Sequence, residues 1–417
     1  MPERWIVISL DALANLALGP YGSSWNSTPN LDHLAAAATT FDRVIVPSDD
    51  CSETLQRCWT AEMGGESWVQ KCRHNGRVEL FALRDLTHPH PADHLATVAT
   101  QAGFDACTLV DWQMTAEPAD EVESTAFAHL AMTLLERLQP TLDPSPSSAE
   151  QGLDWSVLWL HSDFLARHWD APRWLFPIQE LDEHEEPIDP SDPDYWDDGM
   201  TALDEEEVAD SPPPPLQDTT QPPSYQIAAD DHPDWVTSWM QTYGCQVRLV
   251  DQVVQWIQEL AAQLDPNIGI AVLGTSGMSL GQNGWIGHRA GPVRSPQIQV
   301  PLILHAPGQP PLRWPELLAL PDAMRYLVPG AQSPSPAAWA QLVDRAPGSD
   351  AAEHTPQIVT HSTRAVRVLT TPQWFLVRDY DEQVALFLKP DDRDDVNDVA
   401  SRCRDVIEQL ENQPPSE

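Results

Sequence analysis

The feature of this 417-residue sequence that most constrains its fold is a short apolar run, Trp5–Leu10, that stops at an acid, Asp11. An apolar run of this length is typical of a strand buried on both faces of a parallel sheet. In open α/β sheets the ligand site lies beyond the carboxyl ends of the strands. The run therefore predicts a central strand, with Asp11 at the edge of the sheet where a functional site forms.

The next forty residues continue the same pattern. Gly19–Gly22 is a turn, and Thr28 or Asn30 is expected to cap a helix that follows them. Phe41–Val46 is a second apolar run, and it ends shortly before Cys51. The order strand, helix, strand predicts an α/β unit with Cys51 at the same edge of the sheet as Asp11.

The remainder of the chain predicts a central, mostly parallel sheet flanked by helices. Its further strands are expected at Glu79–Leu83, Ala106–Val110, Trp155–Leu160 and Ile268–Leu273, and its helices at Ala92–Ala102, Ser124–Leu138 and Trp235–Leu264. We predict a domain of residues 1–330 and a small C-terminal α+β subdomain of residues 331–417, with strands over Ile358–Leu388 and a closing helix over Val399–Leu410.

The charge of the chain restricts its partners. Its 63 acidic and 23 basic residues give a formal net charge of -40. Such a surface repels the phosphates of nucleic acids and anionic membranes, so we expect neither as a partner. No run approaches the length of a membrane span and the N-terminus has no signal-like segment, which predicts a cytoplasmic protein.

One segment differs from the rest in composition. Residues 180–234 are rich in Asp, Glu and Pro, and no Lys or Arg occurs from Trp174 through Val247. Such a segment buries too little apolar surface to offset the entropy of ordering it. We interpret it as a disordered or loosely held acidic insertion, which is either a solvated loop or a docking segment for a basic protein partner.

Several of these motifs occur together in a known family. Tyr21-Gly22 and Thr28-Pro-Asn-Leu-Asp-His-Leu-Ala35 resemble the "YG…TPNLDxLA" segment of the sulfatase family, in the alkaline phosphatase-like superfamily. The helix around Asp251 resembles the family's scaffold helix, and Gln299–Gly308 its "RVPLIIxxPG" strand. The resemblance implies an alkaline phosphatase-like α/β sandwich and hydrolysis of sulfuric esters, with calcium as the cofactor.

The positions that bind calcium in the family differ in this chain. Members carry two adjacent acids after the first strand, where this chain has Asp11 and Ala12. They carry an Asp with a His or Asn after a later strand, where Thr275 and Ser276 stand here. Calcium takes six to eight oxygen ligands, several of them carboxylates. With Asp11 as the remaining metal ligand, we expect calcium to bind weakly or not at all.

The positions that contact the ester differ as well. The family's Cys-x-Pro-x-Arg motif, whose Cys becomes formylglycine, corresponds to Cys51-Ser-Glu-Thr-Leu55. In the segment that resembles "GYxTxxxGKWH", Asp111 and Gln113 replace the Lys and His that bind sulfate. An acid at such a position works against an anion. The resemblance leaves Cys51 and three histidines as candidate catalytic residues: His161, His168 and His288.

Three hypotheses follow. The joint departure at these positions favours a sulfatase-fold protein with little or no hydrolase activity, which acts as a binding or scaffolding protein. The alternative is an active hydrolase that uses Cys51 as an unmodified thiol nucleophile, helped by His161, His168 or His288. A third hypothesis is an interaction protein that works through the acidic insertion alone.

Overall fold

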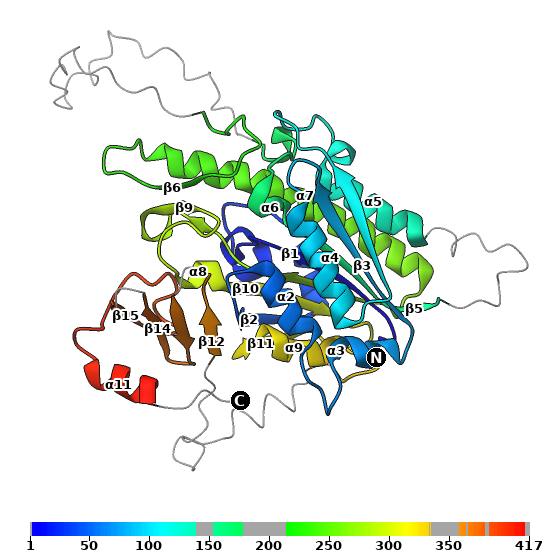
Figure 1. The fold of residues 1–417 in the computed structure, drawn as a ribbon. Helices are drawn as coiled ribbons and strands as arrows, with labels where there is room; N and C mark the ends of the chain where they lie inside the picture. Colours follow the sequence, from blue (N-terminus) through cyan, green and yellow to red (C-terminus); the bar gives the residue numbers. More distant parts are fainter. Residues whose placement is uncertain are drawn as a thin grey trace, which may run out of the picture.

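The structure is a computed structural model that describes residues 2–138, 153–177, 214–332, 334, 358–363, 366–379 and 383–412. Eight of its strands form a central sheet in the order β11-β2-β10-β7-β1-β5-β3-β4 (Figure 1). Neighbouring strands are parallel except where β10 pairs with β2 and β7. The strands are β1 (Trp5–Leu10), β2 (Thr39–Ile45), β3 (Arg77–Asp85), β4 (Ala106–Trp112), β5 (Trp155–Ser162), β7 (Gly269–Gly274), β10 (Gln299–His305) and β11 (Leu312–Ala319).

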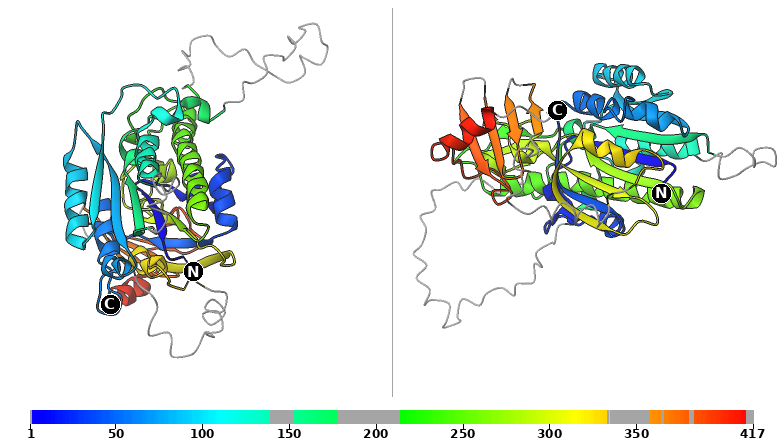
Figure 2. Two further views of the ribbon diagram at one scale, coloured as in Figure 1. Left: turned by 90° about the vertical axis from the view of Figure 1, so that its right-hand side faces the viewer. Right: turned by 90° about the horizontal axis from the view of Figure 1, so that it is seen from below.

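Helices cover both faces of this sheet, as predicted, and the left view of Figure 2 shows the layers. One face packs against α1 (Pro29–Ala36), α5 (Ala126–Leu138) and α7 (Asp234–Leu264), and the other against α2 (Cys51–Trp59), α3 (Trp68–Arg73), α4 (His90–Ala102) and α9 (Leu320–Ala323). Shorter helical turns are η1 (Asn15–Ala17), η2 (Gly19–Tyr21), η3 (Val122–Ser124), α6 (Phe164–Arg167), η5 (Arg173–Leu175), η7 (Gln282–Gly284), α8 (Ser295–Ile298) and η8 (Met324–Leu327).

The central strand β1 contributes side chains to both layers. Ile6, Ile8 and Leu10 pack into the core under α1, α5 and α7. Trp5 and Val7 pack into the core under α2, α3 and α4. Because both faces of the strand are buried, its sequence is continuously apolar and lacks the alternation of a half-exposed strand. The predicted central position of Trp5–Leu10 is therefore confirmed.

Three tryptophans support the helix that begins at Cys51. Trp159 of β5 makes edge-to-face contacts with Trp59 of α2 and Trp68 of α3, with ring centroids 5.7 and 5.4 Å away. Such aromatic pairs add about 0.5–1.5 kcal/mol each to the stabilisation from burial alone. The Trp159 Nε1–H group donates to the Ser9 hydroxyl at 2.7 Å, so its polar atom is also satisfied. The core beneath the junction of β2 and α2 is consequently well packed.

The N-terminus of α1 is capped from a distant segment. Thr28 precedes the helix, but its side chain makes no capping bond and instead accepts from the Gly19 amide at 2.9 Å. The Asp251 carboxylate of α7 accepts from the amides of Asn30 and Leu31 at 3.3 and 2.8 Å. Thr28 therefore occupies the predicted N-cap position, but the prediction that its side chain or that of Asn30 caps the helix is wrong, because the capping oxygens come from Asp251 of α7.

A second, antiparallel sheet lies in the C-terminal part of the chain. Its order is β12-β13-β14-β15, followed by α11, with bounds β12 (Ile358–His361), β13 (Arg367–Thr370), β14 (Trp374–Arg378), β15 (Val384–Leu388) and α11 (Arg404–Asn412). The predicted helix over Val399–Leu410 begins five residues later than expected. The Val399 amide instead donates a hydrogen bond to the Leu386 carbonyl at 2.9 Å. The division at residue 330 stays a prediction.

The end of the acidic segment belongs to the fold. Residues 180–213 lie outside the described residues, but β6 (Ser224–Gln226) pairs with β9 (Trp285–Gly287), which pairs with β8 (Ser279–Leu280). The Gln217 amide and side chain donate to Thr242 and Ser238 of α7 at 2.8 and 2.6 Å. The interpretation of residues 180–234 as one loosely held insertion is thus wrong for residues 214–234.

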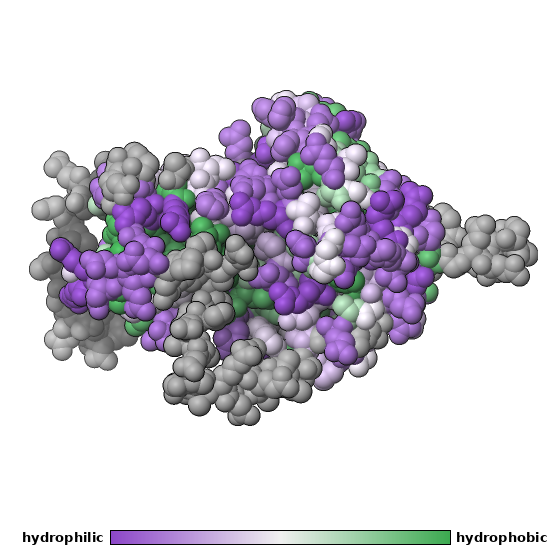
Figure 3. Space-filling model, turned by 60° about the horizontal axis from the view of Figure 1, so that its bottom comes forward, coloured by the Kyte–Doolittle hydropathy of each residue, from purple (hydrophilic) through white to green (hydrophobic). Residues whose placement is uncertain are grey.

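Polar residues dominate the surface of the described part. On the face in Figure 3, most described residues are hydrophilic and hydrophobic residues form only small separate areas. No helix in the described ranges combines the length and hydrophobicity required to cross a membrane.

Candidate active-site cavity

A cavity of about 370 Å³ opens at the carboxyl edge of the central sheet. It is rich in side chains that carry charge or can transfer protons: Asp11, Asp50, Asp163, Cys51, His90, His94, His161, His288, Arg167 and Arg289. The fold therefore brings together the ends of β1 and β5, the start of α2 and the segment after β9. Four of the five residues predicted from the sequence line this cavity, namely Cys51, Asp11, His161 and His288.

Asp11 lies in a loop that α7 holds in place. The residue after it, Ala12, has a positive φ of 61°, a conformation that is uncommon for residues other than glycine. The Tyr243 hydroxyl of α7 donates to the Ala12 carbonyl at 2.7 Å and accepts from the Ala14 amide at 2.9 Å. These contacts fix the direction in which the chain leaves β1, and hence the position of Asp11.

The carboxylate of Asp11 is bound by the two hydroxyls that replace the family's metal ligands. Ser276 donates to Oδ1 at 2.5 Å and Thr275 donates to the same atom at 3.3 Å. The His288 Nε2 atom lies 3.8 Å from Oδ2. Burial disfavours the charged carboxylate, but His288, Arg289 and the Ser276 hydrogen bond outweigh it and lower the pKa of Asp11.

The Ser276 hydroxyl has its full complement of partners. It donates to Asp11, accepts from the Ala12 amide at 2.9 Å, and lies 3.0 Å from the His288 Nε2 atom. A hydroxyl has one donor hydrogen and two acceptor positions. Because its proton points to Asp11, His288 donates Nε2–H to Ser276 and cannot act there as its base. The serine, histidine and aspartate therefore form a structural network without the geometry of a catalytic triad.

The donor set around Asp11 does not fit calcium. One carboxylate and two hydroxyls that already donate to it supply few of the anionic oxygens that calcium takes. Across the described residues, no three His, Cys, Asp or Glu side chains come together in a way that could hold a metal ion. Asp163 and Asp50 line the same cavity, but each is engaged by an arginine: Arg167 lies 2.5 Å from Asp163 and Arg289 lies 3.7 Å from Asp50.

Cys51 is the first residue of α2, and the helix start is built by its neighbours. Asp50 caps the helix by accepting from the Glu53 amide at 2.9 Å. Glu53 stands at the family's Pro position and accepts from the Ser48 hydroxyl at 2.7 Å. Leu55 stands at the family's Arg position and is fully buried in the core. Neither replacement presents a positive charge to Cys51.

The surroundings of Cys51 oppose ionisation of its thiol. Burial raises the pKa of Cys51 well above its ordinary value, and the nearby carboxylates of Asp11, Asp163 and Asp50 raise it further. Arg289 acts in the opposite direction but does not compensate. At neutral pH the group is therefore a thiol, and the thiolate that a nucleophilic cysteine requires is disfavoured.

His161 lies at the end of β5 and is buried. Its Nδ1 atom is 2.9 Å from the Ser9 hydroxyl, which also accepts from Trp159. Burial lowers the pKa of His161 to about 4, although the Asp11 charge works against this shift. The imidazole is consequently neutral at physiological pH, so it contributes no positive charge to an anion in the cavity.

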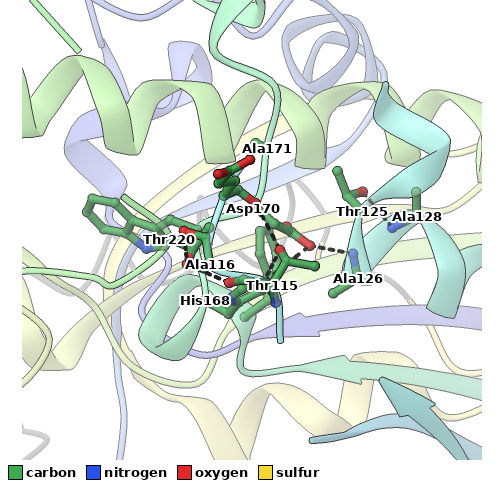
Figure 4. A network of polar contacts seen from close by, with 12 residues as sticks. Thr115, Ala116, Thr125, Ala126, Ala128, His168, Asp170, Ala171 and Thr220 are labelled. Atoms are coloured by element: carbon green, nitrogen blue, oxygen red, sulfur yellow. Dashed lines mark hydrogen bonds and ion pairs between the residues drawn. The ribbon is translucent and has the colours of Figure 1, made fainter. Parts of the chain in front are cut away.

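His168 is placed elsewhere, contrary to its inclusion among the candidate catalytic residues. The described residues that line the cavity do not include it. It lies in the network of Figure 4, where its Nε2 atom is 3.4 Å from the Thr115 amide and 3.8 Å from the Asp170 carboxylate. Burial lowers the pKa of His168 to about 4. The side chain thus joins the loop after α6 to the segment around Thr115.

Asp111 also lies away from the cavity. It is on β4 at the edge of the sheet, where its carboxylate accepts from the Arg84 Nε atom at 2.6 Å. Its side chain is about half exposed, and the pKa of Asp111 is lowered by the hydrogen bond from Arg84. The residue at the position of the family's sulfate-binding Lys is therefore part of a surface ion pair.

Several residues of the cavity were not among the predicted site residues. Asp163 follows His161 by two positions at the end of a predicted strand, and His90 and His94 are four residues apart on α4. These spacings place Asp163 at the same edge of the sheet as His161, and His90 and His94 on one face of a helix. They are the sequence patterns from which these site residues could have been predicted. Arg289 carries no such pattern, since it lies outside the regular helices and strands and itself has a positive φ of 55°.

Solved structures of the same architecture are known. The chain superposes on a phosphonate monoester hydrolase of Agrobacterium radiobacter with a TM-score of 0.63 at 12% identity, covering 99% of this chain and 94% of that one. A putative sulfatase, yidJ, from Bacteroides fragilis gives 0.60 at 14% identity, covering 99% and 94%. A protein solved in complex with its substrate D-glucosamine-2-N,6-O-disulfate gives a TM-score of 0.58 at 13% identity, covering 99% of this chain and 96% of that one.

At these identities the likeness concerns the fold alone. A search among curated proteins found no match. The profile of the family described as Sulfatase matches residues 3–314, which is most of the chain. The chain therefore belongs to the sulfatase family.

Proposed function

We propose that this member of the sulfatase family is a binding or scaffolding protein with little or no ester hydrolase activity. The observation that carries the proposal is the environment of Cys51: a partly buried thiol beside the carboxylates of Asp11, Asp50 and Asp163. A sulfate or phosphate ester that approached this thiol would meet negative charge where catalysis requires positive charge.

The positive charges of the cavity are already neutralised. Arg167 is paired with Asp163 at 2.5 Å, and Arg289 is paired with Asp50 at 3.7 Å. Burial lowers the pKa values of His161 and His288, so both imidazoles are neutral at pH 7. The cavity therefore favours a polar ligand without negative charge over the anionic esters that active members hydrolyse.

The alternative function, hydrolysis with Cys51 as the nucleophile, needs a base that can take the thiol proton. His288 donates to Ser276, and the raised pKa of Cys51 makes the transfer to a buried imidazole unfavourable. This function is supported by the position of the thiol at a helix N-terminus inside the cavity, and by nothing else in the site.

A turnover assay separates the two functions. Purified protein is incubated with aryl sulfate and aryl phosphate esters in calcium, beside Cys51→Ala and, as a matched control, Cys403→Ala in the C-terminal part. The proposal predicts the same background rate for all three proteins. Turnover that Cys51→Ala abolishes and Cys403→Ala leaves intact would establish the hydrolase instead.

We further propose that the acidic segment contacts a protein partner. Its composition supports this, since no Lys or Arg interrupts the acidic residues between Trp174 and Val247. Because residues 214–234 are part of the fold, the informative deletion removes residues 180–213 only. A partner captured by the full chain and lost on this deletion supports the proposal, and one retained by the deleted protein contradicts it.

A further inference from the structure

A second cavity carries the opposite charge from the first. It has a volume of about 310 Å³ and lies where η2, β2 and β11 meet the segment after β15. Four basic side chains line it: Arg43, Arg313, Lys389 and Arg393. Among the described residues that line it, Asp42 supplies the only carboxylate. The chain has only 23 Lys and Arg residues among 417, so four of them around one cavity is more than its composition would lead one to expect.

Two of the four basic groups are neutralised by carboxylates. Arg313 Nε lies 2.6 Å from Asp42, and its guanidinium also donates to the Pro20 carbonyl at 2.5 Å. Lys389 is buried and paired with Asp395. These two cations therefore hold the walls of the cavity together and have little positive charge left for a ligand.

The other two basic groups have no carboxylate within ion-pair distance among the described residues. Arg43 donates to the carbonyls of Pro372 and Thr371 at 2.8 and 3.2 Å, which orient the guanidinium without neutralising it. Glu316 acts on Arg43 only through the longer-range field. Arg393 is exposed, and its guanidinium has no hydrogen-bond partner within the described ranges. Its charge acts on Asp42 at longer range.

A neutral group in the same cavity also lacks a partner. The Asn15 side chain donates to the Gln299 carbonyl at 3.3 Å, but its Oδ1 atom is buried with no hydrogen-bond partner in the described structure. An unsatisfied buried acceptor costs about 1–3 kcal/mol.

We propose that this second cavity binds a small molecule that carries a phosphate or sulfate group, and that the guanidinium groups of Arg43 and Arg393 donate hydrogen bonds to its oxyanion. Guanidinium groups bind tetrahedral oxyanions through paired, charge-assisted hydrogen bonds. The site shares no lining residue with the Cys51 cavity, so an anion bound here is recognised and not hydrolysed. Asp394 lines a smaller adjoining cavity and limits how far a second negative group can extend.

The test is a calorimetric titration of the full chain with inorganic phosphate and, separately, with inorganic sulfate, in buffers matched in ionic strength with chloride. We expect saturable binding that Arg393→Gln weakens at least about tenfold, because a charge-assisted bond is lost. Arg43→Gln should weaken it similarly, and circular dichroism checks the fold of this half-buried position. The tighter anion identifies which ester the site prefers.

Two control variants locate the bound anion. Arg325→Gln removes an exposed arginine of η8, and Arg167→Gln removes a cation of the Cys51 cavity. Both should bind phosphate and sulfate like the unmodified protein. Binding that is lost in Arg167→Gln and retained in Arg393→Gln overturns the proposal. The absence of saturable binding for both anions in the unmodified protein also overturns it.

Discussion

Two buried aspartates, Asp251 in α7 and Asp11 after β1, each join segments that are far apart in the sequence, but they do so with different donors. Asp251 accepts from two backbone amides at the start of α1 and from the Asn30 side chain at 2.8 Å. Asp11 accepts from the hydroxyls of Ser276 and Thr275. The first arrangement holds α1 against α7. In the second, hydroxyl hydrogens point to the carboxylate at the position where the family binds calcium.

The contrast shows that frame and chemistry depend on different residues of this chain. The frame needs buried apolar runs and caps, which are present throughout the sheet and helices. The chemistry needs a cation and an ionised nucleophile, and the residues around Asp11 and Cys51 favour neither. This contrast supports our proposal that the chain keeps the sulfatase fold with little or no ester hydrolase activity.

The largest expected effect comes from breaking the frame. Asp251→Ala removes the cap of α1 and leaves buried amides unsatisfied, so we expect the free energy of unfolding to fall by about 2–4 kcal/mol. Urea denaturation followed by tryptophan fluorescence measures it. Asp230→Ala, at an exposed aspartate, is the matched control and should change stability by no more than about 0.5 kcal/mol. Equal midpoints for the two variants would mean that Asp251 does not hold the frame.

A smaller effect is expected at the site. Asp11→Asn keeps an acceptor oxygen but loses the charge, so we expect a loss on the order of 1 kcal/mol at pH 7. The pKa of Asp11 is lowered in the folded protein. Its contribution is therefore complete above the unfolded-state pKa of about 4, and it disappears as the pH falls through the folded-state pKa.

The difference between the two proteins isolates this titration from that of the other carboxylates. Urea midpoints of wild type and Asp11→Asn should converge as the pH is lowered from 7 towards 3. A constant difference over this range would show that Asp11 is not ionised in the way its neighbours indicate.

The smallest effect concerns the reactivity of Cys51. With a raised pKa, it should react with iodoacetamide at pH 7.5 several-fold more slowly than Cys403, which is also partly exposed. Peptide mapping by mass spectrometry gives both rates in one sample. Asp163→Asn should accelerate Cys51 and leave Cys403 unchanged. If Cys51 is instead the faster thiol, the Cys–His hydrolase gains support.

Much of the frame could be predicted from local sequence. Trp5–Leu10 and Gly269–Gly274 are continuously apolar because both faces of each strand are buried, and that signal needs no tertiary information. The cap of α1 could not be predicted this way, since Asp251 lies about 220 residues from the amides that it accepts from. The end of the acidic segment was also missed, because its stabilisation comes from pairing with β9 and α7.

The site was predicted less completely than the frame. Cys51, Asp11, His161 and His288 follow strands or glycine-rich loops that point to one edge of the sheet, and the fold brings them together. His168 follows the same kind of strand, but the short helix α6 turns the chain away before it. Asp163 and Arg289 line the cavity because the fold brings the end of β5 and the segment after β9 to the same place. Spacing along the chain does not reveal this.

The most direct test of the central claim is calorimetric titration of the purified protein with calcium, with Asp11→Asn as the control. Calcium sensor sites bind with dissociation constants of about 10⁻⁷–10⁻⁵ M. A single carboxylate that already accepts two hydroxyl protons predicts no saturable heat in this range for either protein. Tight binding by the unmodified chain that Asp11→Asn abolishes would contradict the account and indicate an active metal centre.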